Sequence, residues 1–246
     1  MRYFIGNWKM FGLPKSISII NKINAFTKQD NHKKKYSVII TPPFTLLESF
    51  SKFFKNKNIK IGAQNCYHKD HFSSVTGAIS PYMIKSLSTK YVIVGHSDNR
   101  SEGDTDQQLK KKVFFALKNN LKVIFCIGEN KSQKRKKKTK KTLKKQITSV
   151  LEKKFNSKNI IVAYEPVWSI GTGKIPTVSE LSDTTKFIKQ IIYKIFKNKL
   201  PVLYGGSVDS SNIVQFKKLP EIDGFLIGGA SKTSKNFIDI IKNYYK

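Results

Sequence analysis

Short apolar runs and longer segments with helical periodicity alternate along the whole chain, and this alternation restricts the possible folds more than any other property of the sequence. The apolar runs are of strand length, often β-branched and continuous, which is typical of parallel strands covered on both faces. Eight are expected: Tyr3–Gly6, Ser37–Thr41, Ile59–Gln64, Tyr91–Gly95, Val123–Gly128, Ile160–Tyr164, Val202–Tyr204 and Gly224–Ile227. The alternation predicts a parallel α/β sheet, and by itself it leaves open whether the sheet closes into a barrel.

Several helix starts can be predicted between these strands. Apolar residues recur every three or four positions in Asp106–Leu117 and in Leu181–Phe196. Thr105 and Ser179 lie at the starts of these segments and are residue types that cap helices. Proline suits the first helical turn and marks three more expected starts: Pro14, Pro43 and Pro81.

The chain length agrees with a barrel of eight strand–helix units. Such a barrel usually takes about 250 residues, and this chain has 246. No change in composition and no Pro-, Gly- or Ser-rich linker divides the sequence. We therefore expect residues 1–246 to form a single domain.

The chain is strongly basic, with 46 Lys and Arg against 16 Asp and Glu and a formal net charge of +30. One hypothesis is a protein that binds nucleic acid or acidic partners. However, only three of the basic residues are arginines, the type favoured for base readout and bidentate phosphate recognition. We interpret the lysines as a coat on solvated helix faces and expect no nucleic-acid binding. Their densest run, Lys134–Lys145, is predicted to begin a helix with frayed first turns.

Cysteine use and hydropathy indicate the compartment. Cys66 and Cys126 lie far apart without metal-ligand spacing, so we predict neither a disulfide nor a metal site, and we expect Cys126 to be a small buried apolar residue. The N-terminal residues lack the apolar core of a signal peptide. No stretch approaches the roughly 18 apolar residues of a membrane span. A cytoplasmic protein without membrane association is expected.

Polar residues follow many of the predicted strands. In a barrel, active sites lie at the C-terminal ends of the strands. The residues that this rule selects are Asn7, Lys9, Gln64, Asn65, His96, Glu165, Gly205, Gly206, Ser207, Gly228 and Gly229. They include a cation, a histidine, a carboxylate and two glycine-rich turns.

The two glycine-rich turns indicate a phosphate site. Tyr204-Gly-Gly-Ser-Val and Ile227-Gly-Gly-Ala-Ser expose backbone N–H groups, and glycine lets an anion approach them closely. Barrels often bind phosphate after strands seven and eight. Each pair alone is also compatible with an ordinary tight turn, and the two consecutive pairs together favour phosphate.

Glu165 is a candidate general base. It precedes a loop with apolar, stiff ends and a small middle, Gly171-Thr-Gly173, which suits a lid. Closure of such a lid would desolvate the carboxylate and raise its basicity. A surface carboxylate before an ordinary loop is the alternative.

His96 and Lys9 are weaker candidates when each is taken alone. Ser97 is able to cap a short helix, which would put His96 near a helix N-terminus and disfavour the imidazolium. A lone histidine is more often structural, and Lys9 is one lysine among many.

Seven segments, in order and in register across the whole chain, resemble the triosephosphate isomerase family. They are Phe4–Met10, Gly62–Tyr67, Gly95–Ser97, Cys126–Glu129, Ala163–Lys174, Tyr204–Val208 and Gly228–Ser231. The resemblance implies a closed (β/α)8 barrel and the interconversion of dihydroxyacetone phosphate and glyceraldehyde 3-phosphate. It also implies that no metal or organic cofactor is needed, because the substrate carbonyl is the electron sink.

The resemblance assigns roles to individual residues. Glu165 would move the proton between the two carbons of an enediolate. His96 would polarise the carbonyl and transfer protons between the two oxygens. Lys9 would stabilise the oxyanion and the bound phosphate, and Asn7 would orient the first loop. The implied phosphate donors are Gly171, Ser207, Gly228 and Gly229. The segment Pro166–Pro176 resembles the lid, with Pro166, Trp168, Gly173 and Lys174 as its characteristic residues.

Departures from the family concern one carboxylate and the subunit interface. Asp98 replaces the usual glutamate and is one methylene shorter, so reduced turnover is expected. Asn99 and Ala78 replace an Arg and a Glu that pair across the dimer in the family; losing both avoids a buried unpaired charge. The resemblance still implies a homodimer held by Thr76 and its loop. A weakened isomerase and a basic binding protein that uses Lys134–Lys145 remain as alternatives.

Overall fold

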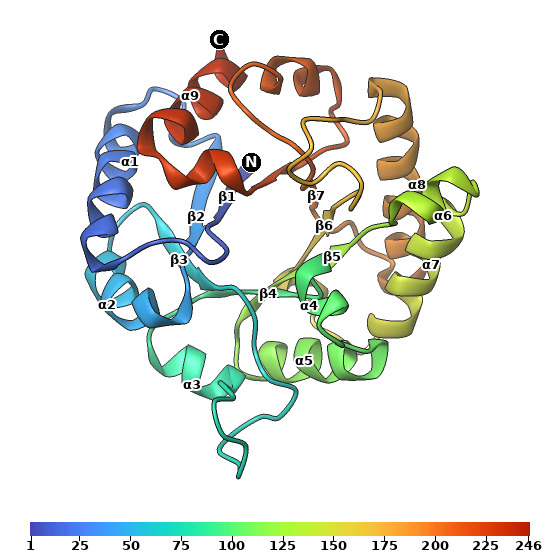
Figure 1. The fold of residues 1–246 in the computed structure, drawn as a ribbon, viewed down its shortest axis with the longest axis horizontal. Helices are drawn as coiled ribbons and strands as arrows, with labels where there is room; N and C mark the ends of the chain where they lie inside the picture. Colours follow the sequence, from blue (N-terminus) through green and yellow to red (C-terminus); the bar gives the residue numbers. More distant parts are fainter.

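A computed structural model describes residues 1–246, and its strands form one closed parallel barrel in the order β1 to β8. Figure 1 looks along the barrel, with the helices arranged around the strands. The strands are β1 (Arg2–Asn7), β2 (Tyr36–Thr41), β3 (Lys60–Ala63), β4 (Tyr91–Val94), β5 (Lys122–Ile127), β6 (Ile160–Tyr164), β7 (Val202–Tyr204) and β8 (Gly224–Ile227). The eight predicted strands and the closed barrel are confirmed.

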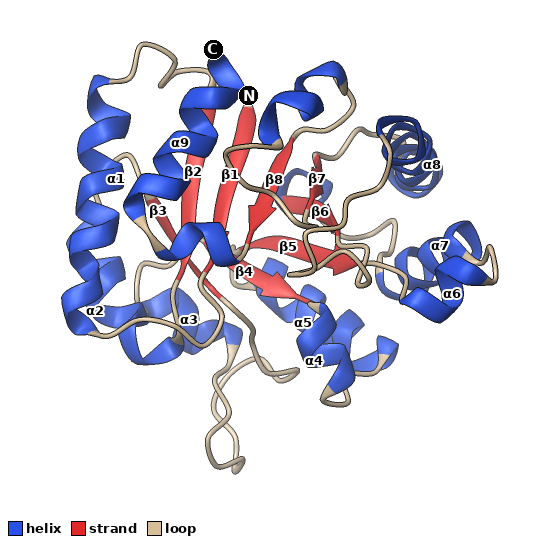
Figure 2. Ribbon diagram, turned by 45° about the horizontal axis from the view of Figure 1, so that its top comes forward, coloured by secondary structure: helices blue, strands red, loops and turns tan.

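The helices alternate with the strands along the chain and lie around the outside of the barrel (Figure 2). They are α1 (Ile17–Gln29), α2 (Phe44–Phe54), α3 (Pro81–Ser86), α4 (Ser97–Ser101), α5 (Asp106–Lys118), α6 (Lys131–Arg135), α7 (Thr139–Val150), α8 (Val178–Phe196) and α9 (Ser234–Tyr245). Short 3-10 turns cover Pro14–Ser16, Ser157–Asn159, Ile213–Lys218 and Gly229–Lys232. No helix is both long and apolar enough to cross a membrane.

Closure of the barrel depends on a close approach between its first and last strands. Tyr3 pairs with Gly224, and a Cβ at position 224 would lie 2.2 Å from the carbonyl oxygen of Tyr3. Real Cβ atoms do not come this close, so only glycine fits here. The register from Tyr3 to Gly6 then follows Gly224 to Ile227.

The apolar residues form two cores, as expected of strands covered on both sides. The larger cluster of 51 buried residues contains side chains of both strands and helices. A second cluster fills the inside of the barrel: Ile5, Ile39, Tyr91, Ile93, Ile124, Cys126, Ile161, Ala163, Leu203 and Leu226. The barrel is therefore a packed body and not a pore. Cys126 is a buried apolar residue inside it, as predicted.

Three local predictions about helices need correction. The cap of α8 is Thr177, whose side chain accepts from Glu180 N–H, and not Ser179. Pro43 precedes α2 as its cap instead of lying in its first turn. The lysine-rich segment forms two helices, α6 and α7, because the chain breaks at Lys137, a non-glycine residue with φ of 53°. Lys197, which caps the C-terminus of α8, has the same left-handed backbone, with φ of 52°.

Candidate active site

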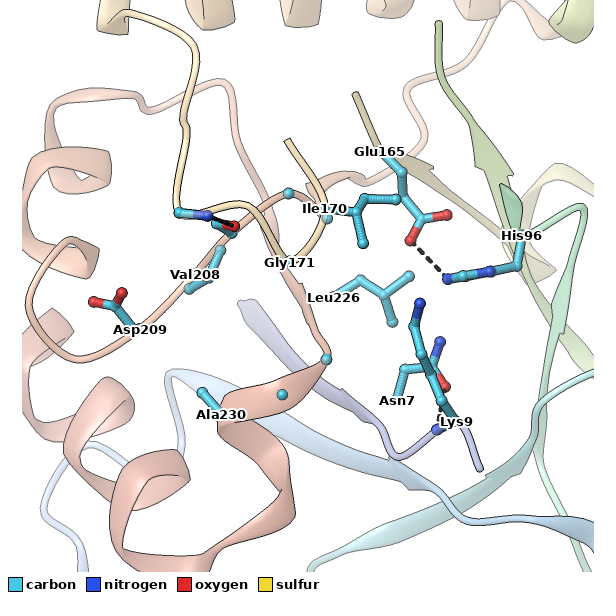
Figure 3. Close-up of a pocket in the computed structure, with 16 residues that line it drawn as sticks. Asn7, Lys9, His96, Glu165, Ile170, Gly171, Val208, Asp209, Leu226 and Ala230 are labelled. Atoms are coloured by element: carbon cyan, nitrogen blue, oxygen red, sulfur yellow. Dashed lines mark hydrogen bonds and ion pairs between the residues drawn. The ribbon is translucent and has the colours of Figure 1, made fainter. Parts of the chain in front are cut away.

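A cavity of 390 Å³ opens at the C-terminal ends of the strands. The loops after β1, β4, β6, β7 and β8 supply its walls (Figure 3). Of the residues predicted from the sequence, Asn7, Lys9, His96, Glu165, Gly171, Gly173, Gly205, Gly206, Ser207, Gly228 and Gly229 line it. Gln64 and Asn65 line a neighbouring cavity, and Pro166, Trp168 and Lys174 lie in the lid without lining the main one.

The first loop holds Lys9 in an unusual backbone conformation. Lys9 has φ of 53°, and its N–H donates to Asn7 Oδ1 at 3.1 Å. Gln64 Nε2 donates to the Lys9 carbonyl at 2.9 Å and to that of Thr41 at 2.8 Å. These bonds fix a strained residue from several sides, which is the pattern expected at functional sites. Gln64 therefore turns toward the loops, and β3 ends one residue earlier than predicted, at Ala63.

The imidazole ring of His96 contacts the start of α4 through one nitrogen and the carboxylate of Glu165 through the other. Its Nδ1 accepts from Asp98 N–H at 3.1 Å, so His96 itself caps α4, and the expectation that Ser97 does so is wrong. Its Nε2 lies 3.2 Å from Glu165 Oε1. An Nδ1 that accepts a hydrogen bond carries no proton, so the proton of the neutral ring is on Nε2 and points to Glu165.

Two opposing effects set the pKa of His96. Burial lowers it, but the negative charge of Glu165 and the hydrogen bond to it outweigh burial, and the pKa is raised. Glu165 is the larger of two acidic contributions to this increase, since Asp98 also raises the pKa of His96 and Lys9 lowers it. Once Glu165 has taken up a proton, the larger of the two charges that favour the imidazolium is gone, and the neutral ring with its proton on Nε2 is favoured.

Glu165 is buried, with 3% of its surface exposed, and leaves one carboxylate oxygen free. Oε2 is buried without a hydrogen-bond partner, whereas Oε1 contacts His96. The backbone N–H of Glu165 donates to the carbonyl of Ile127 at 2.7 Å, which anchors the residue to β5. Glu165 lines the cavity, and a carboxylate with one oxygen free of hydrogen bonds is suited to accept a proton from a ligand.

The far end of the cavity is made mainly of backbone. Gly228 and Gly229 have open space where a Cβ would project, so packing does not require glycine there. Gly171 in the lid also has open space at this point, and φ of 67° favours glycine. These glycines share that end of the cavity with Ser207, Val208, Asp209 and Ala230, and their uncovered backbone lets a phosphate approach closely.

The lid, residues 166–176, contacts both sides of the cavity. Trp168 Nε1 donates to Glu129 Oε1 at 2.8 Å, and Tyr164 Oη contacts both oxygens of the same buried glutamate at 3.2 Å. At the other side, Gly173 N–H donates to Ser207 Oγ at 3.2 Å. The lid thus lies against the turn that follows β7.

Comparisons with known proteins agree with this geometry. The family profile described as triosephosphate isomerase matches residues 2–244. The chain belongs to the triosephosphate isomerase family. A protein of that name from Borrelia garinii subsp. bavariensis is 39% identical, with 98% of each chain covered, and one from Dictyoglomus thermophilum is 37% identical, with 96% of this chain and 97% of the relative covered. A crystal structure of triosephosphate isomerase from Bartonella henselae has a TM-score of 0.90 and 31% identity, and covers 100% of this chain and 99% of its own.

The shortened carboxylate Asp98 still reaches the lysine of this family's site. Its Oδ2 lies 3.0 Å from Lys9 Nζ, although Asp98 is one methylene shorter than the usual glutamate. The backbone N–H of the same residue bonds to His96. The contact is therefore retained, and the expected reduction in turnover stays a prediction.

The sequence did not single out several residues that lie around the cavity and under the lid. Glu129 was noticed only as part of a motif, although it is fully buried and holds Trp168. Ser169 and Tyr204 were not selected, yet their hydroxyls lie 3.1 Å apart beneath the lid. A hydroxyl residue between Trp168 and an isoleucine was the only available signal for Ser169. The thiol of Cys126, by contrast, has its pKa raised well above the usual value by burial, in keeping with an inert side chain.

Proposed function

We propose that this cavity is the active site in which the chain interconverts dihydroxyacetone phosphate and D-glyceraldehyde 3-phosphate, a step shared by glycolysis and gluconeogenesis. The observation that carries the assignment of the site is the placement of Glu165, His96 and Lys9 around one end of a cavity whose other end is exposed backbone. A small molecule with a carbonyl at one end and a phosphate at the other matches this division.

The proton transfers follow from the side chains at the carbonyl end. Glu165 Oε2 takes a proton from the carbon beside the carbonyl, and the C–H electrons move into a C=C bond while the carbonyl electrons move to oxygen. His96 Nε2–H donates to that oxygen, and the Lys9 ammonium stabilises its negative charge. His96 also passes a proton from the hydroxyl of the deprotonated carbon to the former carbonyl oxygen. Glu165 then returns its proton to the former carbonyl carbon, and the deprotonated carbon becomes the new carbonyl carbon. Asn7 orients Lys9 through the bond to its N–H. The substrate carbonyl accepts the electrons, so the step uses no cofactor.

The phosphate is bound at the opposite end in this proposal. Gly171, Ser207, Gly228 and Gly229 supply the donors, and the lid closes over the enediolate. Closure excludes water and keeps the intermediate from eliminating phosphate. Pro166, Trp168, Gly173 and Lys174 belong to the lid, and the bond between Trp168 and Glu129 holds its first part.

We also propose a homodimer. The loop between β3 and α3 projects far from the barrel (Figures 1 and 2) and carries Thr76. A cavity of 260 Å³ beside the active site, lined by Lys9, Met10, Asp98 and others, is available to receive the Thr76 loop of a second copy. Met10 at its rim is 98% exposed and is therefore an apolar contact available to the partner. The same residues 1–246 act as one catalytic domain.

The cytoplasm is the proposed location, and the lysine coat is proposed to have no nucleic-acid partner. Lys134, in the densest basic run, pairs with Glu180 at 2.7 Å and lies 5.2 Å from the ring of Trp168. Part of that run thus supports the lid. A titration with duplex DNA at several salt concentrations tests this, and a steep salt dependence of binding would refute it.

A coupled assay of glyceraldehyde 3-phosphate isomerisation tests the proposed site. Glu165→Gln keeps the shape of the side chain and removes its basicity, so kcat should fall roughly a thousandfold. Lys52→Gln, on the outer helix α2, is the matched control and should retain wild-type kcat. Equal activity of wild type and Glu165→Gln would refute the role of Glu165.

A further inference from the structure

A second cavity lies at the end of the barrel opposite the active site. Its volume is 600 Å³, against 390 Å³ for the active-site cavity. The N-terminal ends of β2 and β3 line it, with Tyr36, Ser37 and Val38 from one strand and Lys60 from the other. The last turn of α1 and the loops before the two strands complete its wall. No step of the proposed isomerisation uses this cavity.

The wall of this cavity carries positive charge and no negative charge. Its charged side chains are Lys28, Lys33, Lys34 and Lys60, and no carboxylate lines it. Eight lysines of the chain pair with a carboxylate, and none of these four is among them. A hollow lined by one sign of charge concentrates the field and attracts ions of the opposite sign. The cavity is therefore suited to an anion.

The acidic residue at the end of α1 does not neutralise these lysines. Asp30 Oδ2 accepts from Tyr36 Oη at 2.6 Å, and its Oδ1 accepts from His32 N–H at 3.3 Å. Both oxygens therefore have partners other than a lysine, and Asp30 is not part of the cavity wall.

Lys60 is the least exposed of the four cations and has no compensating charge. Its side chain is partly buried, and burial together with the positive charge of Lys90, which precedes β4, lowers the pKa of its ammonium group. Both effects disfavour the charged form. An anion bound beside Lys60 would oppose them, so this position favours occupation by negative charge.

Two of the four ammonium groups are already held in place. Lys33 Nζ donates to the Lys28 carbonyl at 2.7 Å, and Lys60 Nζ donates to the Lys57 carbonyl at 3.2 Å. An ammonium group has three N–H donors, so each of these two keeps donors for a ligand. Side chains that are fixed before binding lose less conformational entropy when the ligand arrives.

We propose that this cavity is a second anion site, which binds a small molecule with two or more linked phosphoryl groups. A phosphate monoester carries only about −1.5 to −2 at neutral pH, which is too little to match four ammonium groups. Lysine binds phosphate as a point charge and does not impose the planar geometry of arginine. The site therefore selects density of negative charge, as in a phosphate chain, either inorganic or part of a nucleoside triphosphate.

Isothermal titration calorimetry of the wild-type protein at low salt tests the ligand class, with inorganic tripolyphosphate as the probe and inorganic phosphate as the comparison. We expect tripolyphosphate to bind at least about tenfold more tightly, because only the longer chain contacts several of the ammonium groups at once. Equal affinities for the two anions overturn the proposed class of ligand.

A pair of double variants tests the location. Lys33→Gln with Lys60→Gln removes two of the four charges and should weaken the binding of tripolyphosphate about tenfold. Lys136→Gln with Lys141→Gln is the matched control, since both residues are exposed in the basic run Lys134–Lys145 and the same charge is lost. The control should keep the wild-type affinity. Equal losses in the two variants would mean that the anion responds only to the total charge of the protein, and they overturn the site.

A second pair of substitutions decides the question if the first variant does not fold. Lys28 and Lys34 are exposed, so Lys28→Gln with Lys34→Gln removes two charges from the same wall with little effect on packing. A loss of affinity of about tenfold again supports the site, and an unchanged affinity overturns it.

Titration with ATP in the absence of divalent metal identifies the source of the phosphate chain. If ATP and tripolyphosphate bind equally, and both are weakened by Lys33→Gln with Lys60→Gln, the chain alone is recognised. Tighter binding of ATP, weakened by the same variant, assigns a nucleotide to the cavity. Binding of neither probe to the folded wild-type protein overturns the proposal.

Discussion

Gly205 forms the wall behind the carboxylate of Glu165, and Gly205→Ala tests whether that wall fixes the carboxylate. A Cβ at this position would lie 2.7 Å from Glu165 Cγ and 3.4 Å from Oε1. Carbon atoms in contact prefer about 3.5–4.0 Å. The side chain of Glu165 must therefore retreat by about 1 Å, and its distance of 3.2 Å to His96 Nε2 changes with it.

A displacement of that size has a predictable effect on the reaction. A misplacement of about 1 Å reduces the rate roughly a hundredfold, or about 2.7 kcal/mol. The fold should tolerate the change, because Gly205 does not have a left-handed φ and its N–H bond to the Tyr164 carbonyl, 2.8 Å, does not involve a side chain. Steady-state kcat in both directions measures the loss, and thermal unfolding reports on the fold.

The neighbouring glycine provides the matched control. Gly206→Ala would push on Tyr204 and Ser169 instead of Glu165, so it should leave the contact between Glu165 and His96 in place, whereas Gly205→Ala should change it. If Gly205→Ala keeps kcat within about threefold of wild type in a protein of unchanged thermal stability, then Gly205 does not fix the position of the Glu165 carboxylate.

Three further predictions concern stability, titration and assembly. Asp104→Ala should destabilise the fold by roughly 3 kcal/mol, because Lys112 is only 4% exposed and its Nζ would lose both 2.7 Å contacts with the carboxylate, keeping only Asn65 Oδ1 at 3.0 Å. Urea unfolding measures this, and a change below about 1 kcal/mol would contradict it. Glu165→Gln should lower the pKa of His96, since the charge of Glu165 contributes more to raising it than that of Asp98 does. NMR titration of the imidazole measures this pKa, and an unchanged value would contradict the assignment of the increase to Glu165. Thr76→Arg should convert a dimer at micromolar concentration into a monomer, as followed by sedimentation. A wild-type protein that is already monomeric at this concentration would refute the proposed homodimer.

The barrel and most of the cavity were predictable because they depend on patterns that the chain repeats. Continuous β-branched runs identify strands without reference to the rest of the molecule. Parallel strands that close into a barrel bring all their C-terminal ends to one side. Asn7 and Lys9 lie at the end of β1, His96 follows β4 and Glu165 follows β6, so these residues of three different strands meet in one cavity.

Features decided by single hydrogen bonds were not predictable in the same way. Thr177 and Ser179 are both good caps, and the partner at Glu180 selects the threonine by completing a capping box. His96 replaces Ser97 as the cap of α4 because its ring nitrogen reaches Asp98 N–H. The hydrogen bond between Ser169 and Tyr204 joins residues that are 35 positions apart in the chain, and no local pattern in the sequence indicates it.

Three lysines of this enzyme have a left-handed backbone, and they differ in whether replacement by glycine is expected to stabilise the fold without affecting the proposed chemistry. A non-glycine residue in this conformation costs roughly 1–2 kcal/mol, and Lys9, Lys137 and Lys197 all adopt it. At Lys9 glycine would relieve the strain and remove the proposed oxyanion cation. Lys137 and Lys197 lie at helix ends outside the cavity, where glycine is the favoured C-terminal residue. Engineering for heat resistance should therefore begin at these two positions, since catalysis places no demand on their side chains.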